Sequence, residues 1–272
     1  MTLLPPYLAQ TGYDQQGLPV LREAIARRYS ERGLPTRPDE VMVVNGALSA
    51  FALILRLFTG PGDRVVIDAP TYPMAISAIQ GASCRPVGVA LPQQGWDCDG
   101  LAATIAQTAP RLAWLMPDFH NPTGRCMDAP TRQRVADIAA RTRTTLVIDE
   151  TMADLWYNAP PPRRWPASIP MPRCSPLVRP GKASGGLRIG WIRASARTIA
   201  SLIQARDSLD LGTPLLEQLA CSWLLENAAT LLPPRRNMLK ARRDMCETLM
   251  AEYFPRWRFS PPEGGLSLGG TS

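Results

Sequence analysis

Apolar residues along the first half of the chain follow two alternating patterns. Short apolar runs are typical of strands buried in a parallel sheet, and they occur at Val41–Val44, Arg64–Asp68, Arg85–Ala90, Leu112–Met116 and Thr145–Ile148. Before and between these runs, apolar residues recur at helical spacing. This spacing predicts a helix from Leu18 to near Gly33, and helices at Leu48–Phe58, Pro73–Gly81, Asp99–Thr108 (with Asp99 as N-cap) and Thr131–Thr142. The alternation predicts an α/β fold in which helices flank a mostly parallel sheet.

The second half of the chain departs from this alternation. The stretch Tyr157–Pro180 contains eight prolines and has almost no periodicity. A strand is predicted at Trp191–Arg193, and helices are predicted at Ala196–Leu209, Leu215–Asn227 and Pro234–Tyr253. Trp257–Leu268 resembles a final strand with a turn at Pro261–Gly265. We therefore expect a large domain over residues 1–233, shortened at its N-terminus. Residues 234–272 are expected to contain a connector helix and the start of a truncated small C-terminal domain.

Composition narrows the classes of protein to which the chain can belong. Its 272 residues are 45% hydrophobic, which is ample for a core, and no apolar run approaches the ~20 residues of a transmembrane helix. No signal peptide is recognisable, and six cysteines without CxxC spacing indicate a reduced, cytoplasmic protein without a metal site. The net charge of +7 permits anionic partners. Nearly all of the basic residues are arginines, because the only lysines are Lys182 and Lys240.

A carboxylate stands where a ligand is expected to bind. The apolar strand Thr145–Ile148 runs directly into Asp149, and in open α/β sheets the ligand crevice lies beyond the carboxyl ends of the strands. The turn after the first strand offers backbone N–H groups and a helix N-terminus to a phosphate, although such turns are as often structural. The other candidate residues at strand ends and loops are Gly46, Ala47, Asn121, Lys182 and Arg188. An asparagine, an acid, a lysine and an arginine in this order suggest a site for pyridoxal 5'-phosphate (PLP).

Several short motifs, taken in order, resemble one protein family. They are Gly12-Tyr13, Asn45-Gly46-Ala47, Pro70-Thr71-Tyr72-Pro73, His120-Asn121-Pro122-Thr123-Gly124, Asp149-Glu150-Thr151 and Gly185-Gly186-Leu187-Arg188. With these motifs the chain resembles the fold-type-I PLP-dependent aminotransferases of class I/II. Within that group it is most similar to the aminotransferase-like domain of MocR regulators of the GntR type. The resemblance covers nearly the whole chain and implies a fold-type-I PLP-dependent transferase.

The resemblance implies roles for the residues around the cofactor ring. Lys182 would form a Schiff base with the aldehyde and move the substrate proton. Asp149 would keep the pyridine nitrogen protonated, Tyr72 would stack on the ring, and Asn121 would donate to the phenolic oxygen. The alternative for Tyr72 is an ordinary core position, and for Asn121 a turn-forming role. His120 is interpreted as a structural residue.

The resemblance also implies how the phosphate would be held. Gly46 and Ala47 would present the start of a helix, and Arg188 would supply a cation that can pair with two oxygens. The alternative for Arg188 is a surface ion pair. In the family, the equivalent of Tyr13 reaches the phosphate of the neighbouring subunit, which implies a homodimer with shared sites.

The chain departs from the family pattern at several positions. Pro176 and Pro180 are poor residues for the central strand expected before Lys182, and the spacing from Lys182 to Arg188 is one residue short. A tyrosine that is common after the aspartate is absent, because the positions there are Thr151 and Met152. No residue can be assigned to the arginine that binds the substrate carboxylate, since most of the small domain is missing. We therefore expect weak PLP binding and little or no turnover.

Three functions follow as hypotheses. The first is an aminotransferase that moves an amino group from an amino acid to a 2-oxo acid. The second is the ligand-sensing domain of a MocR-type transcription regulator without its winged-helix module, so that DNA would be a partner only of a longer product. The third is a catalytically inactive fragment that folds partly or not at all. Of these possibilities we expect the fold and the PLP-site architecture to be present. No membrane partner is expected, and the substrate cannot be deduced from the residues.

Overall fold

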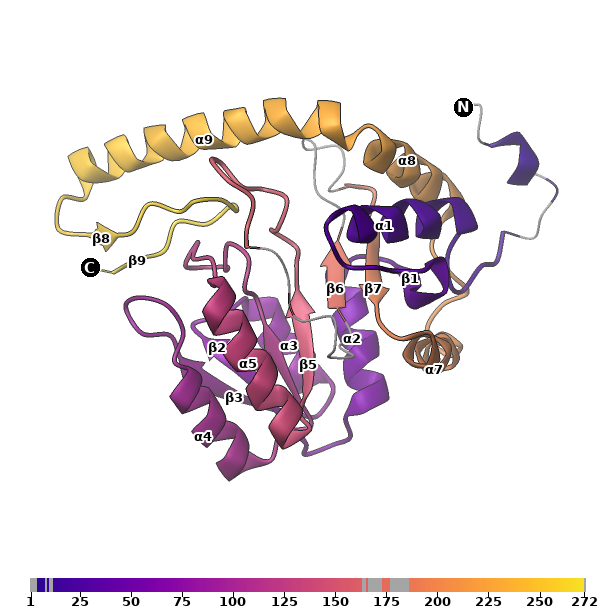
Figure 1. Ribbon diagram of the computed structural model, residues 1–272, viewed down its shortest axis with the longest axis horizontal. Helices are drawn as coiled ribbons and strands as arrows, with labels where there is room; N and C mark the ends of the chain where they lie inside the picture. Colours follow the sequence, from indigo (N-terminus) through magenta and orange to yellow (C-terminus); the bar gives the residue numbers. More distant parts are fainter. Residues whose placement is uncertain are drawn as a thin grey trace.

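The computed structural model describes residues 4–7, 9, 12–162, 165, 173–176 and 186–271, with the backbone alone at 173–176 and 271. The main sheet is built from strands β1 (Val41–Val44), β2 (Arg64–Ala69), β3 (Arg85–Ala90), β4 (Leu112–Leu115), β5 (Thr145–Asp149), β6 (Arg173–Pro176) and β7 (Gly190–Arg193). Their order across the sheet is β1-β7-β6-β5-β4-β2-β3 (Figure 1). Strand β7 pairs antiparallel with β1 and β6, and the other pairs are parallel. The predicted mostly parallel α/β sheet is therefore confirmed.

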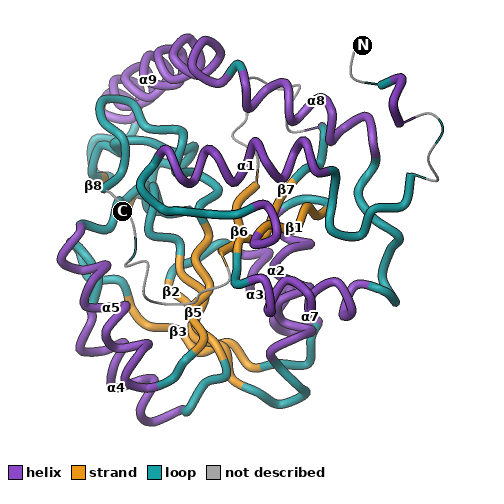
Figure 2. The backbone as a smooth tube through the Cα atoms, turned by 45° about the vertical axis from the view of Figure 1, so that its right-hand side comes forward, coloured by secondary structure: helices purple, strands orange, loops and turns teal. Residues whose placement is uncertain are grey.

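Helices cover both faces of this sheet. They are α1 (Pro19–Glu31), α2 (Ala47–Phe58), α3 (Pro73–Gly81), α4 (Cys98–Thr108), α5 (Ala129–Thr142), α7 (Ala196–Arg206), α8 (Leu215–Glu226) and α9 (Ala228–Tyr253), with short 3-10 turns at Pro5–Tyr7 and Pro38–Glu40. Figure 2 shows the strands between α2, α3 and α7 on one side and α4 and α5 on the other. No helix in the described part of the chain is long and apolar enough to cross a membrane.

Alternation along the strands assigns each apolar side chain to one face. On β4, Trp114 packs into the core cluster formed with α2, α3 and α7, whereas Ala113 and Leu115 pack against α4 and α5. At the β1–β7 edge, Val41 and Trp191 belong to a third cluster under α1 and α8. The sheet is therefore buried on both faces, as its apolar strands predict.

The start of α4 corrects one prediction. Asp97, and not Asp99, caps this helix, because the Asp97 carboxylate accepts a hydrogen bond of 2.8 Å from the Gly100 backbone N–H. Asp99 lies in the first turn and pairs with Arg134 on the surface. Both acids suit a helix N-terminus, so their order could not be decided from residue type.

The proline-containing elements also differ from expectation. Strand β6 forms with Pro176 as its last residue, so this proline does not prevent the central strand, while Pro180 lies outside the described residues. Helix α9 begins at Ala228 and continues through Pro233 and Pro234. The domain boundary expected between residues 233 and 234 therefore falls inside a continuous helix, and the division into two domains stays a prediction.

The C-terminal residues form a hairpin in place of the single predicted strand. Strands β8 (Arg258–Phe259) and β9 (Gly270–Thr271) pair antiparallel beneath the far end of α9 (Figure 1). Helix α9 itself packs through Leu232 and Leu239 on Leu155 and Tyr157, in the loop after β5. The loop after β5 is thus covered by α9, and it separates two cavities.

Candidate functional site

A cavity of about 220 Å³ lies beyond the carboxyl ends of β4 and β5, on the sheet face covered by α2 and α3. Six of the eight residues predicted for the site line it: Gly46, Ala47, Tyr72, Asn121, Asp149 and Arg188. The topology explains this convergence, because parallel strands bring their carboxyl ends to one edge of the sheet even when they are far apart in sequence.

Asp149 enters this cavity because of its position at the end of β5. Val147 packs on the α2 and α3 side of the sheet and Ile148 on the α4 and α5 side, so alternation turns Asp149 to the same face as Val147. The Asp149 carboxylate is buried, and it accepts a hydrogen bond of 2.8 Å from the Thr151 backbone N–H. Burial raises the pKa of Asp149 to about 7. A cationic ligand group would lower this pKa again, because it favours the ionised carboxylate.

The start of α2 and Arg188 form the second part of the cavity. Gly46 has φ +103°, a conformation that favours glycine, and the next residue begins α2. A Cβ atom at Gly46 would lie 3.1 Å from Arg188 Nη2, and one at Gly190 would lie 2.6 Å from the Gly46 carbonyl carbon. Glycines at both positions therefore allow close approach of the backbone, with a guanidinium beside a helix N-terminus. Such an arrangement suits a phosphate.

Tyr72 and Asn121 complete the polar lining. Tyr72 immediately precedes α3, and its partly buried ring packs against the core cluster on the cavity side. Asn121 lies in the turn after β4 and accepts a hydrogen bond of 3.1 Å at Oδ1 from the Ser267 hydroxyl. A buried acid, an amide, a tyrosine and a guanidinium thus surround one space, as the resemblance implied.

The other two predicted residues are not among the described residues that line this cavity. Lys182 lies outside the described residues. Tyr13 is 69% exposed and is not part of the cavity lining. Its expected role in the site of a neighbouring subunit stays a prediction.

The structure adds residues that sequence reasoning missed. Trp114 lines the cavity from β4, and its buried indole N–H has no hydrogen-bond partner among the described residues. The alternation Leu112, Trp114, Met116 along the strand was a signal that could have identified it. Leu266 also lines the cavity. It lies far along the sequence from the other lining residues, and no sequence pattern indicated this contact.

A buried pair of titratable residues lies behind the turn that carries Asn121. Asp68 Oδ2 and His120 Nε2 are 3.6 Å apart, and neither atom has a hydrogen-bond partner in the described structure. Burial raises the pKa of Asp68 to about 7 and lowers that of His120 to about 4. The Trp96 indole donates to Asp68 Oδ1, and His120 Nδ1 is 2.9 Å from the Thr123 hydroxyl oxygen. The His120 ring therefore contacts the side chains of Asp68 and Thr123, which agrees with its interpretation as a structural residue.

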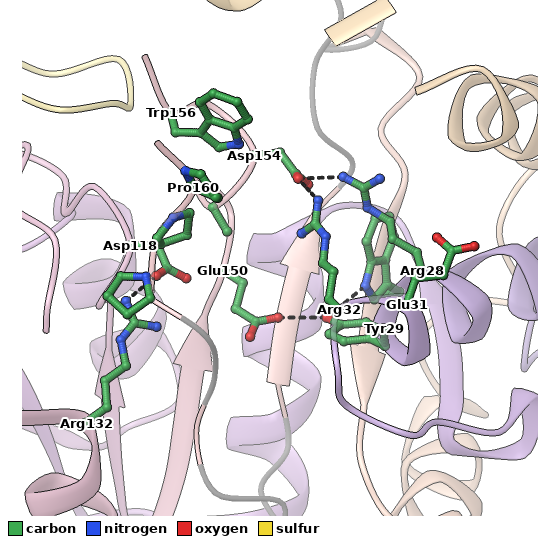
Figure 3. A pocket seen from close by; sticks show the side chains of 14 residues that line it. Arg28, Tyr29, Glu31, Arg32, Asp118, Arg132, Glu150, Asp154, Trp156 and Pro160 are labelled. Atoms are coloured by element: carbon green, nitrogen blue, oxygen red, sulfur yellow. Dashed lines mark hydrogen bonds and ion pairs between the residues drawn. The ribbon is translucent and has the colours of Figure 1, made fainter. Parts of the chain in front are cut away.

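A second cavity, of about 270 Å³, lies on the opposite side of the loop after β5 (Figure 3). Several of its polar and charged side chains pair with one another. The Tyr29 hydroxyl donates to Glu150, Arg132 pairs with Asp118 at 2.6 Å, and Arg28 lies 2.5 Å from Asp154. We therefore interpret these residues as structural ion pairs. The adjacent acids Asp149 and Glu150 line different cavities.

The Asp154 ion-pair cluster consists of Asp154, Arg28, Arg32 and Arg236. Arg28 and Arg32 come from α1, Arg236 comes from α9, and all three contact the buried Asp154 carboxylate. Arg236 also donates to the Asp154 carbonyl at 2.9 Å and stacks over Trp156, 3.8 Å from the ring centroid. The cluster therefore joins α1, the loop after β5 and α9.

The sequence is similar to transcriptional regulators and to transaminases. The chain is 28% identical over 270 residues to an uncharacterized HTH-type transcriptional regulator of Bacillus subtilis, YisV, covering 97% of the chain and 55% of the regulator. It is 28% identical to a 2-aminoadipate transaminase of Thermus thermophilus, covering 88% of the chain and 62% of that enzyme. The chain thus spans little more than half the length of these curated relatives.

Solved structures of aminotransferases are similar to this chain as well. An α-aminoadipate aminotransferase of Thermus thermophilus, solved with N-(5'-phosphopyridoxyl)-L-leucine, superposes with a TM-score of 0.85 at 26% identity, covering 96% of this chain and 69% of the other. A multiple substrate aminotransferase of Thermococcus profundus also has a TM-score of 0.85 at 26% identity, with coverages of 96% and 68%. The family model for aminotransferase class I and II matches residues 9–268. The chain therefore belongs to the aminotransferase class I and II family.

Proposed function

We propose that this chain binds PLP in the cavity beyond β4 and β5, and that it transfers an amino group from an amino acid to a 2-oxo acid. PLP is the cofactor that the family implies. The observation that best supports the proposal is the burial of Asp149 at the end of β5, in one cavity with Tyr72, Asn121 and Arg188.

The residues present fit this cofactor on structural grounds. The missing side chains at Gly46 and Gly190 allow Arg188 to lie beside the start of α2, where N–H groups and the helix dipole favour negative charge. The buried acid Asp149 in the same cavity suits a protonated ring nitrogen. Apolar side chains that also line the cavity suit a flat ring, and they include Phe51, Trp114 and Leu155.

Each polar residue then has a defined task. When bound, PLP supplies an aldehyde and an electron-withdrawing ring. The Asp149 carboxylate would accept a hydrogen bond from the protonated ring nitrogen and so keep the proton on that nitrogen. The Asn121 amide would donate to the phenolic oxygen. Arg188 and the N–H groups at the start of α2 would hold the phosphate, and the Tyr72 ring would pack on the face of the cofactor.

Lys182 supplies the direct test of this proposal. Incubation with PLP followed by borohydride reduction and peptide mass spectrometry is expected to yield an adduct on Lys182, because this lysine matches the family's cofactor-binding position. Lys240, on α9, serves as the internal control. An adduct on Lys240 alone, or no adduct and no change in the visible spectrum, would contradict the proposal.

A second function is supported by the relatives that are transcription regulators. In this alternative the chain binds PLP as the effector domain of a MocR-type regulator and does not release product. Assays of amino-group transfer from common amino acids to 2-oxo acids separate the two functions. Turnover supports the enzyme, whereas a Lys182 adduct without turnover favours the effector domain or an inactive fragment.

We further propose that two copies of the chain form a dimer in which Tyr13 contacts the cofactor phosphate of the partner. The strong exposure of Tyr13 is consistent with such a role. Tyr13→Phe is expected to weaken PLP binding at least tenfold, because a hydrogen bond to a charged group contributes about 1.5–3 kcal/mol. Binding of pyridoxal, which has no phosphate, should not change. Equilibrium titration of both ligands, with sedimentation to confirm the dimer, checks this prediction, and a stable monomer with unchanged PLP affinity would contradict it.

A further inference from the structure

The segment Pro261–Gly269, between β8 and β9, lies across the candidate site. Hydrogen bonds join one side of it to the loop after β5: the Gly265 N–H donates to the Leu155 carbonyl, and the Tyr157 N–H donates to the Glu263 carbonyl, both at 2.9 Å. The Tyr157 hydroxyl donates to the Gly265 carbonyl at 2.8 Å. These contacts fix the segment relative to the strand that carries Asp149.

The other side of the segment packs on the turn that carries Asn121. A Cβ atom at Gly264 would lie 2.7 Å from the Phe119 ring, and one at Gly124 would lie 2.6 Å from Pro262 Cβ. Glycine is required for such close approach. The segment therefore has little freedom to shift against the turn, and it brings two side chains to the cavity.

Those two side chains are Leu266 and Ser267. Leu266 lines the cavity, and the Ser267 hydroxyl donates to Asn121 Oδ1 at 3.1 Å. An asparagine side chain has one end that accepts hydrogen bonds and one end that donates them. Because Oδ1 is already engaged by Ser267, the NH2 group is the end of the amide that is left for a ligand.

We propose that Ser267 is a positioning residue, which stabilises the orientation of the Asn121 amide whose NH2 group faces an anionic oxygen of the ligand. This inference rests on the proposed function, in which that oxygen is the phenolic oxygen of PLP. A hydroxyl group can donate or accept, so Ser267 alone would tolerate either amide orientation. The ligand oxygen only accepts, and the two partners together select one orientation.

Loss of the Ser267 hydroxyl should therefore weaken the contact with one ligand atom, the phenolic oxygen of PLP. Ser267→Ala is expected to weaken PLP binding about fivefold, since Asn121 Oδ1 loses its neutral donor when the ligand is bound. An analogue of PLP in which the phenolic hydroxyl is replaced by hydrogen should bind the variant and the wild type equally. Ser267→Thr keeps the hydroxyl and should restore PLP affinity.

The experiment is an equilibrium titration of the full chain with PLP and with this analogue, followed by tryptophan fluorescence. Ser201→Ala is the matched control, because Ser201 is a half-buried serine on α7 whose hydroxyl donates to the Arg197 carbonyl. Thermal unfolding of each variant reports on folding. Equal weakening of PLP and analogue in Ser267→Ala would show a packing effect and overturn the inference. Unchanged PLP affinity in Ser267→Ala would overturn it while leaving the proposed function intact. A wild-type chain that binds no PLP would overturn both.

Discussion

Replacing Asp154 with asparagine is expected to lower the free energy of unfolding by about 3–5 kcal/mol, because it removes the negative partner of a buried ion pair and leaves the cations behind. The Asp154 side chain is 7% exposed, and those of Arg28 and Arg236 are 16% and 11% exposed. Burial already lowers the pKa of Arg28, and it lowers that of Arg236 to about 10. The positive charges of Arg28 and Arg236 would thus remain largely buried without a negative partner. Urea denaturation followed by circular dichroism measures the change.

An exposed ion pair provides the control for this prediction. Asp99 pairs with Arg134 at the surface, where the two side chains are 84% and 57% exposed. Asp99→Asn is therefore expected to change the free energy of unfolding by no more than about 1 kcal/mol. A similar small effect for Asp154→Asn would mean that the Asp154 ion-pair cluster does not join α1 and α9 to the loop after β5 in solution.

The second large effect is expected at Asp149. Asp149→Asn should weaken PLP binding by about 2–5 kcal/mol, which is roughly 30-fold or more, because a protonated ring nitrogen loses its buried anionic partner. The asparagine side chain preserves the shape of the aspartate, so the loss would report on charge. Titration with PLP followed by absorbance and fluorescence measures the dissociation constant.

The neighbouring acid is a matched control for Asp149. Glu150 lines the other cavity and accepts a hydrogen bond of 2.8 Å from the Tyr29 hydroxyl. Glu150→Gln keeps an acceptor for that hydroxyl and removes one charge from the same loop, so PLP affinity is expected to stay unchanged. Equal losses in both variants would indicate a general electrostatic effect and would argue against a direct contact of Asp149 with the cofactor.

Much of the fold follows from the spacing of apolar residues. The strand that ends at Asp149 and the helix that begins at Ala47 were both predicted, because a buried strand and an amphipathic helix leave distinct periodic patterns. Local details were less predictable. Two acids near the start of α4 are chemically equivalent as caps, and only the backbone geometry selects Asp97. The predicted helix began at Pro234, because proline is typical of the first turn of a helix, whereas α9 begins at Ala228.

The candidate-site residues were predictable where a motif follows a predicted strand. They were not predictable where a contact depends on a segment that comes much later in the sequence. Asp149 and Asn121 follow predicted strands, so the parallel topology alone brings them together. The contact between Asn121 and Ser267 spans 146 residues and depends on the path of the chain after α9. No local pattern encodes that path. Pro176 was expected to disturb the central strand, yet it is the last residue of β6.

The divergent orientation of Asp149 and Glu150 has a consequence for sequence change in this part of the chain. A slip of β5 by one residue against β4 would exchange the faces of every side chain on the strand. It would turn Glu150 toward the cavity that Asp149 lines, and it would take the hydrogen-bond acceptor away from the Tyr29 hydroxyl in the same step. An insertion or deletion in the short turn between α5 and β5 is therefore expected to affect ligand recognition and structural integrity together. Point substitutions, in contrast, can alter either cavity separately.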